Sequence, residues 1–149
     1  MEQAASYPVQ TLTAAYGLFE AGALRPGQAV LVHSSAGGVG LQALQILSKC
    51  DAAVLGLVGS DSKAQLLQER FAKYAKQRQT IDSQQHMEVQ QPETQHQQQQ
   101  KQQQQQRPYL EFAARQGDSA AVKQQLSGFL SRAGCSGFDV ILDSLGPGQ

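Results

Sequence analysis

Short apolar runs alternate with amphipathic segments along most of the chain. Residues 29–33 are apolar and partly β-branched up to a final histidine, as is typical of a strand that helices cover on both faces. Residues 53–58 form a second such run, and residues 138–143 a third. Between the first two, residues 41–50 place apolar side chains at helical spacing. Strands that alternate with helices in this way predict a parallel, doubly wound α/β sheet.

Three further amphipathic helices are expected, one before the first strand, one after the second and one before the third. Their apolar positions are Leu12, Ala15, Tyr16 and Phe19; Leu66, Leu67, Phe71 and Tyr74; and Val122, Leu126, Phe129 and Leu130. We expect Asp61 to cap the second of these helices and Asp118 the third, because a carboxylate accepts hydrogen bonds from free N–H groups at a helix start. Gly134 should end the third.

Composition divides the chain into three parts. Residues 6–76 and 108–149 are ordinary globular sequence, whereas residues 77–107 are dominated by glutamine. We expect this middle part to be a disordered insertion, because it has no apolar pattern to offset the entropy of ordering it. Closing a loop costs only about 0.6 kcal/mol more for each doubling of its length. The two globular parts can therefore belong to one domain.

The turn after the first strand fits the dinucleotide-binding pattern of three spaced glycines, with Ser35 in the place of the first. Gly37 would let a pyrophosphate approach the backbone, and Gly40 would let the next helix lie close to the strand. The amino end of that helix offers free N–H groups to phosphates. The alternative is that the glycines only form a tight turn. We expect a partial Rossmann-type doubly wound sheet, with residues 6–76 and 108–149 as its two parts.

The residues after the second strand indicate which dinucleotide binds. An NAD site usually has a carboxylate there, whereas an NADP site replaces it with groups that bind the 2′-phosphate. Ser60 can donate a hydrogen bond and Lys63 supplies positive charge, so NADPH is favoured. Two alternatives stay open: Asp61 could bind the ribose, and Lys63 could be an ordinary solvated lysine.

Charge and composition narrow the class of ligand. Twelve basic and twelve acidic residues cancel, which argues against nucleic acid as a partner and favours a small-molecule cofactor. Cys50 and Cys135 match neither a disulfide framework nor a metal motif, and His86 and His96 lack partner ligands, so we expect no metal. No apolar run is long enough to span a membrane. We expect a cytoplasmic protein.

Two segments, residues 13–19 and 24–40, closely resemble the medium-chain dehydrogenase/reductase superfamily, in its zinc-independent quinone oxidoreductase and enoyl reductase branch. The likeness covers residues 6–67 and returns at residues 137–146. The resemblance implies that NADPH is the cofactor and that its pyrophosphate binds at Ala36, Gly37, Gly38, Val39 and Gly40. It implies that Ser60 and Lys63 hold the 2′-phosphate, and that Ser144, Leu145 and Gly146 lie near the nicotinamide. A family tyrosine also contacts that phosphate, for which Tyr74 and Tyr109 are candidates.

The resemblance also implies what the parent reaction is. Family members pass hydride from NADPH to a quinone or an activated double bond, using a separate barrel domain and further strands that this sequence does not contain. We therefore expect no catalytic residue here and little or no catalysis from this chain alone. The alternative is a non-catalytic interaction protein that keeps the scaffold and self-associates through its glutamine tract. His33, at the end of the first strand, could steer the pyrophosphate or simply pack.

Overall fold

The computed structural model of the chain describes residues 2–72, 109–115 and 119–143. In chain order the elements are α1 (Glu2–Ala15), the π-helix η1 (Tyr16–Ala21), β1 (Gln28–Val32), α2 (Gly38–Leu47), β2 (Ala52–Val58), a helix over residues 61–72, β3 (Tyr109–Ala114), α5 (Ser119–Ala133) and β4 (Val140–Leu142). The expected insertion over residues 77–107 and the expected cap Asp118 lie outside the described residues.

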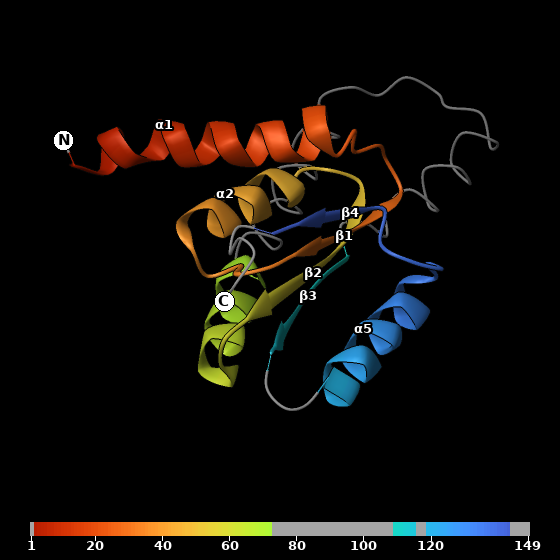
Figure 1. Cartoon of the computed structure of the whole chain (residues 1–149). Helices are drawn as coiled ribbons and strands as arrows, with labels where there is room; N and C mark the ends of the chain where they lie inside the picture. The colour runs from red at the N-terminus through yellow and green to blue at the C-terminus, as the bar shows by residue number, and fades with distance from the viewer. Residues whose placement is uncertain (1, 73–108, 116–118, 144–149) are drawn as a thin grey trace, which may run out of the picture.

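The four strands form one parallel sheet in the order β3-β2-β1-β4 (Figure 1). Val30 of β1 pairs with Val54 of β2 on one side and with Val140 of β4 on the other. All four strands therefore end at the same edge of the sheet, which we call the carboxyl edge. The expected doubly wound parallel fold is confirmed.

Helices cover both faces of the sheet, as the apolar strands required. All seven residues of β2 are buried, and successive side chains face opposite sides. Val54 and Val58 belong to a core cluster with α1, α2 and the helix over residues 61–72. Leu55 and Leu57 pack instead with Phe129 of α5. The helix that connects β3 to β4 thus lies on the face opposite the other helices.

The π-helix η1 packs closely against β4 through two glycines. A Cβ on Gly17 would lie 2.8 Å from Cδ1 of Leu142, and a Cβ on Gly22 would lie 2.8 Å from Cγ1 of Val140. The N–H of Gly22 donates to the carbonyl of Gly17, 3.0 Å away, which is the wide i→i+5 bond of a π-helix. Side chains larger than hydrogen at these positions would push the segment off the sheet.

The strand β3 is absent from the sequence-based prediction. It pairs with β2 from Tyr109 opposite Ala53 to Ala114 opposite Val58. Its six residues include a charged one, Glu111, whose carboxylate is 2.5 Å from the guanidinium of Arg132 on α5. A strand at the border of a sheet is buried less completely and can carry a charged residue. Its sequence therefore lacks the continuous apolar run by which the other strands were predicted.

The first helix presents a different face to the core than its large apolar residues predict. Leu12, Tyr16 and Phe19 are 69%, 66% and 44% exposed, whereas Ala14 and Leu18 are fully buried. The expected buried face is therefore wrong. The pair that packs is spaced by four residues, and the small side chain of Ala14 lets the helix approach α2 and the sheet. Helix α1 also begins at Glu2, well before Leu12, the first apolar position expected in it.

The remaining helices follow the prediction more closely. Leu67 and Phe71 are buried as expected, while Leu66 is 64% exposed and Tyr74 lies outside the described residues. Phe129 anchors α5 in the core. Gly134 ends α5 in a left-handed conformation, with φ of +68°, as a glycine after a helix commonly does. Among the described residues, no helix is long and apolar enough to cross a bilayer.

Candidate dinucleotide-binding site

The turn after β1 is tied to both neighbouring strands. The N–H of His33 donates to the carbonyl of Leu142 at the end of β4, 2.9 Å away, and the N–H of Ser35 donates to Leu57 of β2, also 2.9 Å away. The Ser35 hydroxyl is fully buried and donates to the carbonyl of Val32 at 2.7 Å. Ser35 therefore holds the turn at the carboxyl edge, and its hydroxyl points into the protein rather than toward a ligand.

Gly37 is the residue at which the turn becomes helix. Its N–H donates to the carbonyl of Ser34 at 2.8 Å, and its own carbonyl accepts the first helical hydrogen bond, from Leu41, at 2.8 Å. No side chain caps the helix that follows. The first N–H groups of a helix have no partner within it. Those of Gly38, Val39 and Gly40, together with the positive end of the helix dipole, could therefore hold an anion.

Gly40 sets how closely α2 approaches the turn. A Cβ on this residue would lie 2.5 Å from the carbonyl oxygen of Ser34 and 2.8 Å from Cα of Ser35. Both are backbone atoms, which cannot swing aside as the end of a side chain can. Only glycine permits this approach, which fits the packing role expected for Gly40.

The segment after β2 borders open space. A Cβ on Gly59 would meet nothing within 4 Å, and the hydroxyl groups of Ser60 and Ser62 lie 3.1 Å apart. The carbonyl of Ser60 accepts the N–H of Ala64 at 3.1 Å, so Ser60 takes the cap position that we expected for Asp61. Asp61 is instead the first helical residue, because the helix begins one residue earlier than expected.

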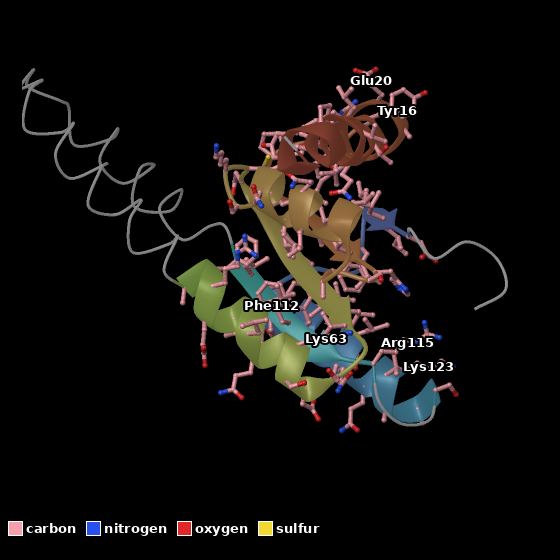
Figure 2. All side chains as sticks on the ribbon, turned by 90° about the vertical axis from the view of Figure 1, so that its left-hand side faces the viewer. Tyr16, Glu20, Lys63, Phe112, Arg115 and Lys123 are labelled. Carbon is pink, nitrogen blue, oxygen red and sulfur yellow. The ribbon has the colours of Figure 1, made fainter. Side chains whose placement is uncertain are left out.

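Lys63 lies in the first turn of the helix over residues 61–72 and is exposed. Figure 2 shows its side chain at the carboxyl end of the sheet, near the start of that helix. The two predicted phosphate-binding regions, residues 36–40 and residues 60–63, thus follow neighbouring strands and share one edge. The third, Ser144, Leu145 and Gly146, lies outside the described residues.

No family model matches the chain, but comparison with known proteins finds several that are similar to it. The hybrid PKS-NRPS synthetase pyvA of Aspergillus violaceofuscus is 46% identical over 70 residues, which make up 47% of this chain and 2% of that protein. The nucleotide-binding subdomain of the enoylreductase domain of PpsC from Mycobacterium tuberculosis aligns with 93% of this chain and 54% of its own, at 27% identity and a TM-score of 0.55. A quinone oxidoreductase of Escherichia coli, solved with NADPH, is 41% identical, covering 43% of this chain and 20% of its own, with a TM-score of 0.41.

This chain is a partial nucleotide-binding fragment, and the proteins to which it is similar belong to the medium-chain dehydrogenase/reductase superfamily. Its relatives are enoyl reductase domains of polyketide synthases and quinone oxidoreductases, so the resemblance seen in the sequence is confirmed. The chain spans between 2% and 54% of the length of the relatives named above.

The residues at this edge of the sheet fit a nicotinamide dinucleotide. The uncapped amino end of α2 supplies N–H groups for a diphosphate, and the space beyond Gly59 is open to a ribose and its substituents. Among the described residues, no three histidine, cysteine, aspartate or glutamate side chains gather in a way that could hold a metal ion.

Two polar residues at this edge of the domain escaped the sequence analysis. The carboxamide of Gln10, on α1, lies against Gly38, where a Cβ would come within 2.6 Å of its Cδ. No sequence signal marks a single glutamine on a helix. Arg115 follows β3 directly, and its N–H donates to the carbonyl of Val58 at 2.6 Å. A strand prediction over residues 109–114 would have placed Arg115 at the carboxyl edge.

Proposed function

We propose that this chain binds the diphosphate and adenosine part of NADPH, as the nucleotide-binding portion of a reductase. The observation that carries the proposal is the contact between Gly40 and Ser34. A Cβ on Gly40 would lie 2.5 Å from the carbonyl oxygen of Ser34. Because glycine has no Cβ, the free amino end of α2 can lie at the carboxyl edge of the sheet. Ligands of parallel α/β sheets bind at that edge.

Each predicted residue has a distinct role in this proposal. The backbone N–H groups of residues 36–40 would grip the diphosphate, and Gly37 would leave room for it. Ser35 would act through its buried hydroxyl, which fixes the turn. Ser60 and Lys63 would bind the 2′-phosphate, which NADPH has and NADH lacks. The residues that resemble the family's nicotinamide loop, Ser144, Leu145 and Gly146, would lie beside the redox-active ring.

The reaction belongs to the parent enzyme and to the cofactor. When bound, the reduced nicotinamide supplies a hydride, which a reductase of this type would pass to a quinone or an activated double bond. The residues of this chain would bind and orient the cofactor, and we assign none of them a step in the chemistry. The names of the relatives favour the double bond of an enoyl group as the acceptor.

Titration of the purified full chain with NADPH and with NADH, followed by calorimetry, tests the proposal. We expect NADPH to bind more tightly, and the substitution Lys63→Ala to weaken NADPH about tenfold while NADH changes little, because a charge-assisted hydrogen bond to the 2′-phosphate is lost. Lys49→Ala is the matched control, since Lys49 is an exposed lysine just beyond the carboxyl end of α2. Failure to bind either dinucleotide at millimolar concentration, in a chain that circular dichroism shows to be folded, would refute the proposal.

A further inference from the structure

Helix α1 lies along α2 on the same face of the sheet (Figure 1). A hydrogen bond links the two helices, in which the hydroxyl of Thr11 donates to Oε1 of Gln42 at 3.3 Å. Gln10 directly precedes Thr11, and Gly38 lies one helical turn before Gln42. This packing therefore brings Gln10 to the amino end of α2, where the diphosphate is proposed to bind.

The carboxamide of Gln10 lies directly against the backbone of Gly38. A Cβ on Gly38 would lie 2.6 Å from Cδ of Gln10 and 2.8 Å from its Oε1, and its nearest neighbour would be Nε2. The carboxamide occupies this position because Gly38 has no side chain of its own. Gly38 thus has a second role besides its free N–H, since it leaves space for a polar group from another helix.

This carboxamide has no hydrogen-bond partner in the part of the chain that the structure describes. The carboxamides of Gln28 and Gln42, by contrast, each accept a hydrogen bond. Gln10 is half-buried, and a polar group withdrawn from water is stabilised when it finds a partner. A carboxamide offers two N–H donors. An anion held at the amino end of α2 would provide the acceptor.

We infer that Gln10 is a side-chain ligand of the dinucleotide and donates an N–H of its carboxamide to a diphosphate oxygen, beside the backbone N–H groups of Gly38 and Val39. This inference rests on the proposed function. The diphosphate is common to NADPH and NADH, so Gln10 contributes equally to the binding of both. It differs in this from Ser60 and Lys63, which are proposed to distinguish the two.

The donors at this end of α2 are uncharged. Neither α1 (residues 2–15) nor α2 (residues 38–47) contains a lysine or an arginine. The positive end of the helix dipole is therefore assisted by neutral N–H groups alone. A charge placed at position 10 should change the affinity for a diphosphate strongly, and the direction of the change should follow the sign of the charge.

Calorimetric titration of the full chain with NADPH and with NADH at 0.1 M salt tests Gln10 through three substitutions. We expect Gln10→Ala to weaken both dinucleotides about fivefold, because one hydrogen bond to a charged group is lost. Gln10→Glu keeps the size of the side chain but places a negative charge beside the diphosphate, so it should weaken both more than about tenfold. Gln10→Lys supplies a charge-assisted hydrogen bond and should strengthen both about threefold.

Gln45→Glu and Gln45→Lys are the matched controls. Gln45 is half-buried like Gln10 and lies in the last turn of α2. It follows Gly38 by seven residues, or roughly 10 Å along the helix, which is about one Debye length at 0.1 M salt. Each control should therefore change either affinity by less than about twofold.

The expected order of affinity for both dinucleotides is Gln10→Lys, wild type, Gln10→Ala and Gln10→Glu. A glutamine that only packs α1 against α2 would give another order, because the isosteric Gln10→Glu would be tolerated better than Gln10→Ala. That result overturns the inference, as do unchanged affinities, a loss confined to NADPH, or equal effects at Gln45. If circular dichroism shows that Gln10→Lys is unfolded, the comparison of Gln10→Glu with Gln10→Ala decides.

The same titrations separate this inference from the proposed function. If the wild-type chain prefers NADPH and Lys63→Ala lowers that preference, the proposed function stands whatever the result at Gln10. Absence of binding by the folded wild-type chain overturns both.

Discussion

Phe112 of β3 packs directly over the backbone of Gly56 in the middle of β2, where a Cβ would lie 2.7 Å from Cδ1 of the ring. The same Cβ would lie 2.8 Å from the buried hydroxyl of Ser35. Gly56 therefore makes room for an aromatic ring on one strand and for the turn that follows another. Both the packing of β3 on β2 and the geometry of the turn after β1 therefore depend on Gly56.

We predict that Gly56→Ala lowers the free energy of unfolding by about 1–3 kcal/mol, because a methyl group forces the Phe112 ring to move within a packed core. Urea denaturation followed by circular dichroism measures the change. Gly137→Ala serves as the control, since a Cβ there meets nothing within 4 Å, and it should change stability by less than about 0.5 kcal/mol. Equal stability of the two variants would show that the core accommodates the methyl group.

Much of the sheet and of the glycine turn could be predicted from the sequence, because these features depend on residues that are close together in the chain. The strands β1 and β2 are continuous apolar runs, and the glycine turn between β1 and α2 has a fixed spacing. Position 40 requires glycine because a Cβ there would collide with the carbonyl oxygen of Ser34, only six residues earlier in the sequence. Such features can be recognised from a short stretch of sequence, without knowledge of the fold.

Other features depend on partners far apart in the sequence, and these were missed. Nothing local shows that η1 turns Leu18 inward and Tyr16 outward, because the choice depends on how α1 and η1 pack against α2 and the sheet. Strand β3 follows a glutamine-rich segment, carries Glu111 and is stabilised by pairing with β2. Arg115 could not be placed at the carboxyl edge of the sheet until that pairing was known.

The choice of buried face along α1 and η1 gives a second prediction. Leu18→Ala should lower the free energy of unfolding by about 2–5 kcal/mol, because it leaves a cavity among fully buried neighbours. Leu12→Ala removes the same atoms from a side chain that is 69% exposed and should cost less than about 1 kcal/mol. Thermal and urea denaturation of the two variants compare the sites directly. A larger loss from Leu12→Ala would mean that the outward face of α1 is covered in solution.

The glycine turn gives a third prediction, which separates folding from binding. Gly40→Ala should destabilise the domain by roughly 2 kcal/mol or more, because its Cβ meets backbone atoms of the turn. Gly37→Ala should cost the fold less than Gly40→Ala, since its Cβ would lie 3.1 Å rather than 2.5 Å from the carbonyl oxygen of Ser34, and Gly37 has a φ of −78°. It should nevertheless weaken NADPH and NADH alike, because the new methyl group lies where the diphosphate is proposed to bind. Urea denaturation and calorimetric titration of both variants distinguish the two effects.

A final prediction concerns ionic strength, since the proposed 2′-phosphate site consists of exposed charges. Exposed charges are screened as salt rises, and the Debye length shortens from about 10 Å at 0.1 M to about 3 Å at 1 M. The ratio of NADPH to NADH affinity should therefore fall several-fold between these concentrations of potassium chloride, and it should fall less in Lys63→Ala, which has one cation fewer. The diphosphate contacts are common to both dinucleotides and largely cancel in the ratio. A ratio that does not change with salt would mean that the preference for NADPH comes from uncharged groups such as Ser60 rather than from Lys63.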